Sequence, residues 1–156
     1  MLRRAAVLAL LAACASPAAA AEREVVAYLL GGLVSGPYRV SADLGAGTVE
    51  ESRPPGAHGD GAGLDALTMP ATRGGTLPAG SAERIRALAR AVLRDGAERR
   101  GCLPTIDALV RFHIVRGDVV RDLDASSPCM AEGADRLRAA LMCGMEPGTS
   151  GCLLGQ

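Results

Sequence analysis

The chain contains no tryptophan and no lysine, and tyrosine and phenylalanine together supply only 2% of its 156 residues. Without lysine, a phosphate-binding loop of the P-loop type and lysine-based Schiff-base catalysis are both excluded. So few aromatic rings cannot form the stacking platform on which single-stranded nucleic acids bind. The 17 basic residues, all of them arginine, are matched by 17 acidic residues, so there is no basic excess to neutralise a phosphate backbone. The composition therefore argues against nucleic acid as a partner.

Histidine is also scarce, since only His58 and His113 are present. They form neither a three-histidine zinc site nor a His-Glu-x-x-His motif, and no Gly-x-Ser-x-Gly turn presents a nucleophilic serine. Asp122 and Asp124 share one face of a predicted strand, where two carboxylates could serve glycoside hydrolysis or hold a cation. A solvated strand face explains them equally well. We therefore predict no catalytic residue, no metal ligand and no cofactor.

The first 21 residues have the composition of an export signal. Arg3 and Arg4 precede an apolar run over residues 5–13, which is about half the ~20 residues that a spanning helix needs. Leu11-Ala12-Ala13-Cys14 then matches a lipobox, so we expect cleavage before Cys14 and lipidation of its thiol. Cleavage near Ala21, after an Ala-x-Ala site, is the alternative. The first of these predicts a periplasmic protein that is lipid-anchored to the outer membrane.

Four cysteines remain once Cys14 is assigned to the export signal, and none forms a Cys-x-x-Cys pattern. An even number in an exported chain indicates a disulfide framework. Cys102 and Cys129 flank a predicted hairpin, whose open ends are neighbours, so these two can pair. Cys143 ends the last predicted helix and Cys152 follows a Gly/Pro-rich bend, so we expect a second bridge between them.

The remaining chain, residues 24–156, is predicted to form one small domain. Apolar alternation indicates a half-buried strand over residues 38–44, and an apolar stripe at three- and four-residue spacing indicates an amphipathic helix beginning at Ser81. Residues 53–80 are rich in Gly and Pro and are predicted to be a mobile loop. Further strands are predicted at residues 24–30, 48–52, 108–114 and 119–123. A second helix is predicted to start at Ser127-Pro128 and to end at Cys143. Residues 144–156 are predicted to form a tail, in which Gly144 and Pro147 prevent a helix.

This order, β-β-β-α-β-β-α, predicts an α+β fold in which an antiparallel sheet of about five strands carries two helices on one face. It resembles emfourin-like domains, small bacterial proteins of which some inhibit thermolysin-type metalloproteases, and an uncharacterised lipoprotein domain with the same arrangement. The matching features, within residues 24–143, are Gly31-Gly32 after the first strand, the Tyr38-Arg39-Val40-Ser41 strand, the Leu77-Pro78 entry to the first helix, and the hairpin before the last helix. The cysteines, the long loop and the tail depart from the emfourin pattern, and no inhibitory residue can be carried over.

Three functions follow from these features. The first is a non-catalytic, lipid-anchored exported domain that binds a protein or another envelope component. The second, implied by the resemblance, is an inhibitor of a secreted thermolysin-type metalloprotease. The third is a small hydrolase that uses Asp122 and Asp124 or His113.

Overall fold

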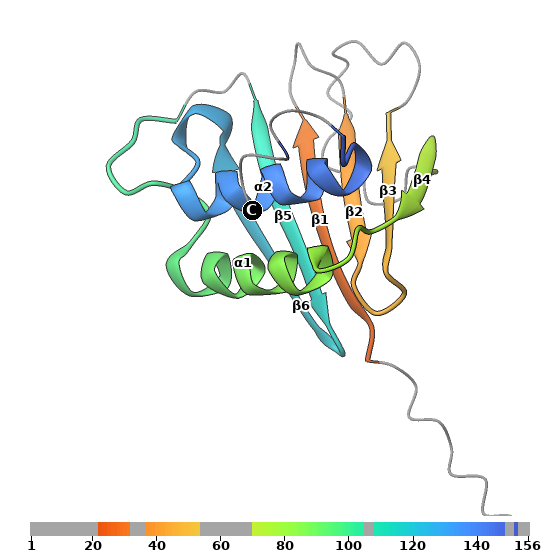
Figure 1. Ribbon diagram of the computed structural model, residues 1–156. Coiled ribbons are helices and arrows are strands. Elements are labelled where there is room, and N and C mark those ends of the chain that lie inside the picture. The colour runs from red at the N-terminus through yellow and green to blue at the C-terminus, as the bar shows by residue number, and fades with distance from the viewer. Residues whose placement is uncertain (1–21, 32–36, 54–69, 105–107, 149–151, 153–156) are drawn as a thin grey trace, which may run out of the picture.

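A computed structural model describes residues 22–31, 37–53, 70–104, 108–148 and 152. Six antiparallel strands form one open sheet in the order β4-β3-β2-β1-β5-β6, and both helices cover the same face of it (Figure 1). The fold class is therefore α+β, as the sequence predicted, with one strand more than expected. The elements are β1 (Glu24–Gly31), β2 (Tyr38–Asp43), β3 (Thr48–Ser52), β4 (Arg73–Thr76), α1 (Ser81–Asp95), β5 (Leu109–Arg116), β6 (Val119–Ser126), a 3-10 turn (Ser127–Cys129) and α2 (Glu132–Met145).

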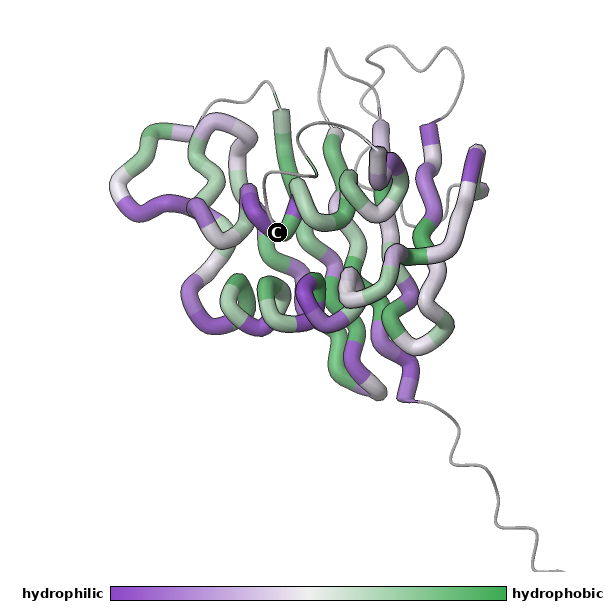
Figure 2. Tube along the Cα trace, viewed as in Figure 1, coloured by the Kyte–Doolittle hydropathy of each residue, from purple (hydrophilic) through white to green (hydrophobic). Residues whose placement is uncertain are grey.

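The core lies between the sheet and the two helices. Strand alternation sends one side chain in two toward the helices, and those side chains are the apolar ones. Tyr28 stands at the centre, with its ring centroid 6.5 Å from that of Tyr38 and 5.7 Å from that of Phe112. The rest of the core is aliphatic, as the shortage of aromatic residues requires, and Figure 2 displays it as hydrophobic strands beneath the helices. The helices contribute Ile85, Ala89, Val92, Ala134, Leu137, Ala140 and Leu141.

Within the described part of the chain no helix covers the other face of the sheet, which is polar on its outer strands and carries the buried Ala27, Leu29 and Val115 at its centre. Arg39 is also buried there, and its Nη2 donates to the Oγ of Ser52 at 2.8 Å. Ser41, Ala27, His113 and Asp122 follow one another across four strands of this face. Arg39, Ser41 and Asp43 lie on this face of β2, as the alternation over residues 38–44 requires, but the face is less solvated than the alternation alone suggests.

Part of the predicted loop over residues 53–80 is a strand. Arg73–Thr76 forms β4 and pairs with Thr48–Glu51 of β3 at one edge of the sheet. The sequence Arg-Gly-Gly-Thr has no apolar side chain, and all four residues are exposed, so the strand depends on its backbone pairing and left no hydrophobic pattern. Residues 54–69 and the prediction of their mobility lie outside the described residues.

The helix start predicted at Ser81 is confirmed, whereas the start predicted at Ser127-Pro128 is wrong. Gly80, with φ of 78°, is the N-terminal cap of α1, and Ser81 is the first helical residue and caps nothing with its side chain. Ser127-Pro128 begins only a 3-10 turn, and α2 starts later, at Glu132. Pro suits the first position of either kind of turn, so this signal does not distinguish a short turn from a full helix.

Gly144 also lies inside a helix, because α2 continues to Met145 instead of ending at Cys143. The position is a close contact between helix and sheet. A Cβ on Gly144 would lie 2.9 Å from Leu77 Cδ2 and 3.6 Å from Val49 Cγ2. Glycine is needed here for packing, and its helix-breaking tendency is overridden by burial of the apolar face of α2.

Two disulfides join Cys102 to Cys129 and Cys143 to Cys152, with Cα–Cα distances of 5.6 and 5.3 Å. These are the two pairings predicted from the position of the hairpin and of the Gly/Pro-rich bend. The first closes the base of the β5–β6 hairpin, and the second holds Cys152 against the end of α2.

Candidate functional site: a disulfide-braced corner

The segment that follows α1 is fastened to the segment that precedes α2. Arg99 N donates to Cys129 O at 2.7 Å, and Ala131 N donates to Ala97 O at 2.9 Å. The Cys102–Cys129 disulfide adds a covalent link beside these two backbone hydrogen bonds. We call the described residues 97–104 and 127–131 the braced corner.

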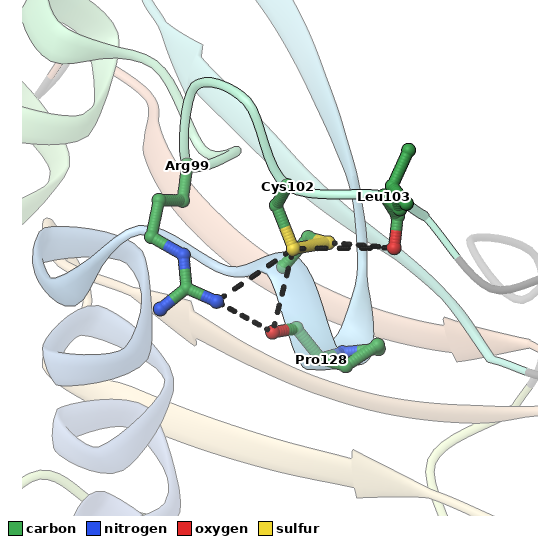
Figure 3. Close-up of a disulfide and its surroundings, with 5 residues drawn as sticks. Arg99, Cys102, Leu103 and Pro128 are labelled. Carbon is green, nitrogen blue, oxygen red and sulfur yellow. Dashed lines mark hydrogen bonds between the residues drawn. A yellow bond between two sulfur atoms is a disulfide. The ribbon is translucent and has the colours of Figure 1, made fainter.

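Side chains tighten the braced corner further (Figure 3). Arg99 Nη2 lies 3.6 Å from Cys102 Sγ and 3.4 Å from Pro128 O, so the guanidinium spans the two segments. Cys129 Sγ lies 3.3 Å from Leu103 O, a close contact and not a donated hydrogen bond, because a disulfide sulfur carries no proton. Cys129 itself is fully buried. The contact with the buried Cys129 therefore fixes the backbone carbonyl of Leu103 on the buried side of this segment.

Leu103 projects from the braced corner into solvent. It is 88% exposed, the most exposed large apolar side chain in the described part of the chain. Pro104 follows it, and a residue before proline is restricted to extended backbone conformations. Leu103 is therefore presented on an extended segment whose position is fixed by the disulfide. A partner that buries this side chain need not order the segment first, which is the advantage of a preorganised loop.

The predicted carboxylates are engaged across the hairpin instead of converging on a site. Arg111 donates twice to Asp124, from Nε at 2.6 Å and from Nη2 at 2.8 Å, and His113 Nδ1 lies 2.7 Å from Asp122 Oδ1. Each pair consists of directly opposed residues of β5 and β6. This is the cross-strand pairing expected of a solvated strand face.

A cavity of about 390 Å³ lies on the polar face of the sheet, and both His113 and Ser41 line it. Ala27 separates these two residues, so their backbones are two strand spacings apart, about 9.5 Å. No hydrogen bond joins them within the described chain. Likewise, no group of three or more His, Cys, Asp or Glu that could hold a metal ion occurs among the described residues.

We predict that Asp124 titrates below the ordinary range of an aspartate. The hydrogen bonds from Arg111 lower the pKa of this carboxyl, so its ion pair favours the folded state above the unfolded pKa and is lost as the pH falls through the folded one. NMR titration of the carboxyl carbon should detect the lowered pKa. Arg111→Gln should return it toward the usual value, and an unchanged pKa in that variant would contradict the assignment.

Leu103 is the residue that sequence reasoning missed. The available signal was an apolar residue between a disulfide cysteine and a proline, Cys102-Leu103-Pro104, but its exposure depends on how the two segments pack. His58 and the predicted lipidation residue Cys14 lie outside the described residues. None of the described helices is long and apolar enough to cross a membrane. No protein-family model matches the chain, and no curated protein matches it significantly.

Proposed function

We propose that this chain is a non-catalytic exported domain that binds another protein through the braced corner. The observation that carries the proposal is Leu103, a large apolar side chain that is 88% exposed on a covalently fixed segment. The disulfide stabilises the fold, and it also fixes the backbone beside this exposed side chain. Protein contacts concentrate their energy in such anchors, surrounded by groups that exclude water.

The first test is the variant Leu103→Ser, with Leu109→Ser as its control. Both leucines are exposed, at 88% and 50%, but Leu109 belongs to the regular strand β5. Burying a leucine contributes about 1.5–3 kcal/mol, so Leu103→Ser should weaken partner binding about tenfold or more. The melting temperature should change little, because surface substitutions stay within about 0.5 kcal/mol. Partner affinity that is equal in the two variants would contradict this assignment.

Inhibition of a secreted peptidase is the more specific form of this proposal. Two observations favour it: the extended, braced segment at Leu103-Pro104, which could occupy a peptide-binding cleft, and the emfourin-like element order. Interfaces between proteases and their inhibitors are preorganised, with little backbone movement on binding. The test is inhibition of peptide hydrolysis by a thermolysin-type metallopeptidase, with a serine peptidase as a parallel assay. Inhibition that Leu103→Ser relieves would support it, and full activity of both peptidases with excess protein would reject it for those classes.

We also propose that Cys14 is lipidated. The lipobox Leu11-Ala12-Ala13-Cys14 directly after an apolar run supports this. Metabolic labelling with a palmitate analogue should mark the wild-type protein and miss Cys14→Ser. Recovery of a soluble, unlabelled protein beginning near Glu22 would show that plain secretion is correct instead.

A further inference from the structure

The turn that joins β5 to β6 lies beside the start of the described chain. Gly117 N donates to Arg23 O at 2.8 Å, and Arg116 is paired with Glu24 of β1. In Figure 1 both the hairpin turn and the first residues of β1 lie at the lower end of the molecule. An attachment that keeps the N-terminal segment close to a surface therefore also keeps this turn close to that surface. We call residues 116–121 the hairpin tip.

The hairpin tip exposes apolar side chains in a place where the fold does not use them. Val119 is 53% exposed and Val120 is 47% exposed, and successive residues of a strand point to opposite faces, so the tip exposes one valine on each face. In Figure 2 this end of the hairpin shows hydrophobic stretches next to hydrophilic ones. On the helix side, Val119 lines an open groove together with Leu93, Ile114 and Leu123.

Three arginines and two carboxylates lie near this end of the molecule: Arg23, Arg116, Arg121, Asp118 in the turn itself and Glu22, which lines the same groove as Val119. Arg116 and Arg121 line the same groove as Val119, and Arg121 Nη1 donates to the backbone oxygen of Val120 at 3.1 Å. Within the described chain none of the three arginines is in an ion pair. The three arginines and two carboxylates give a net formal charge of +1, so this apolar tip suits an anionic lipid surface, where each arginine contributes about 1 kcal/mol and each carboxylate opposes it.

The length of chain between Cys14 and Glu22 also favours a bilayer as the surface that the hairpin tip contacts. Eight residue steps lead from Cys14 to Glu22, and an extended chain spans at most about 3.5 Å per residue, so the reach is about 28 Å. An acyl group on Cys14 would keep the hairpin tip within that distance of a bilayer. Because the anchor tethers the protein, even a low-affinity contact between the hairpin tip and the bilayer forms at high effective concentration.

We propose that the hairpin tip docks on an anionic bilayer surface, with Val119 and Val120 entering the headgroup region and Arg116 and Arg121 contacting lipid phosphates. The docked orientation rests on the proposed lipidation of Cys14. Leu103 precedes β5 and the hairpin tip follows it, so the braced corner lies at the other end of that strand (Figure 1). Docking would turn the braced corner away from the membrane, toward its partner.

The absence of tryptophan allows a direct test. Val120→Trp places a single fluorescent reporter on the hairpin tip, and Leu109→Trp places a matched one at the far end of the same hairpin. Each protein is reconstituted from the envelope into vesicles of 30% phosphatidylglycerol and 70% phosphatidylcholine, with brominated acyl chains as quencher. We expect a blue shift and quenching for Val120→Trp only. Arg116→Gln with Arg121→Gln should weaken the docking about fivefold for each arginine removed.

The outcomes separate docking from anchoring. Protein that floats with the vesicles while Val120→Trp stays unquenched would overturn the docking and leave the lipid anchor intact. If the protein does not float, the anchor fails, and the same reporter titrated with excess vesicles decides the docking alone: a blue shift supports it, and none rejects it. A reporter that responds to protein concentration and not to vesicles would assign the hairpin tip to contact with a second copy, and so reject the membrane.

Discussion

Replacing Val110 by aspartate is expected to lower the free energy of unfolding by about 4 kcal/mol, the largest effect of any single substitution considered for this protein. Val110 is fully buried on the helix-facing side of β5, beside Leu30 and Ala125 in the neighbouring strands. An aspartate there would be an unpaired charge in an apolar core, which costs several kcal/mol or forces uptake of a proton. Urea denaturation at neutral pH measures the loss, which should shrink as the pH falls and the carboxyl is protonated.

The matched controls are the two neighbours of Val110 on the same strand. Leu109 is half exposed, so Leu109→Asp should change the stability by about 0.5 kcal/mol or less. Arg111→Asp removes the double hydrogen bond to Asp124 and opposes two carboxylates, so an intermediate loss of about 1 kcal/mol is expected. Equal losses for Val110→Asp and Arg111→Asp would mean that the faces of β5 are reversed.

Removing the Cys102–Cys129 disulfide should cost about 3 kcal/mol and also weaken partner binding. Cross-linking positions separated by 27 residues restricts the unfolded chain, and that restriction is lost in the double variant Cys102→Ala, Cys129→Ala. The binding effect has a separate cause: Leu103 would be presented on a segment that must be ordered when the partner binds. Denaturation and partner affinity are measured on the same preparation.

The second disulfide supplies the control. Cys143 and Cys152 are separated by only 9 residues, so Cys143→Ala with Cys152→Ala should cost less stability and leave partner affinity unchanged. A matching loss of affinity in both double variants would show that binding follows overall stability. The braced corner would then have no special part in it.

Periodic patterns carried most of what the sequence could predict. The alternation around Val110, Phe112 and Ile114 identified the buried face of β5, because a strand with one covered face must place its apolar side chains on that face. The Cys102–Cys129 disulfide followed from the hairpin, which brings its ends together, and the Cys143–Cys152 disulfide followed from the Gly/Pro-rich bend after the last helix. For β5 the local pattern had only one way to bury its apolar side chains.

The features that the sequence did not predict depend on packing between distant parts of the chain. Gly144 remains helical because it fits against Leu77 and Val49, and β4 exists because β3 offers an unpaired edge, so both depend on residues that are distant in sequence. Leu103 was overlooked for a related reason: its significance is its exposure, and exposure is set by how the whole domain packs. The exposure of apolar side chains at the braced corner and at the hairpin tip likewise depends on tertiary packing.

The sheet order has a consequence for the sequence of events during synthesis. β1 is the first strand to be made, yet it lies between β2 and β5, and β5 begins only at Leu109. β2 can pair with β1 at once, whereas the opposite edge of β1 must wait for the last third of the chain. Such late, non-local closure slows folding and leaves an apolar strand edge open to other chains. During most of its synthesis, a chain of this topology therefore remains incompletely folded and can be bound by any machinery that handles unfolded polypeptides.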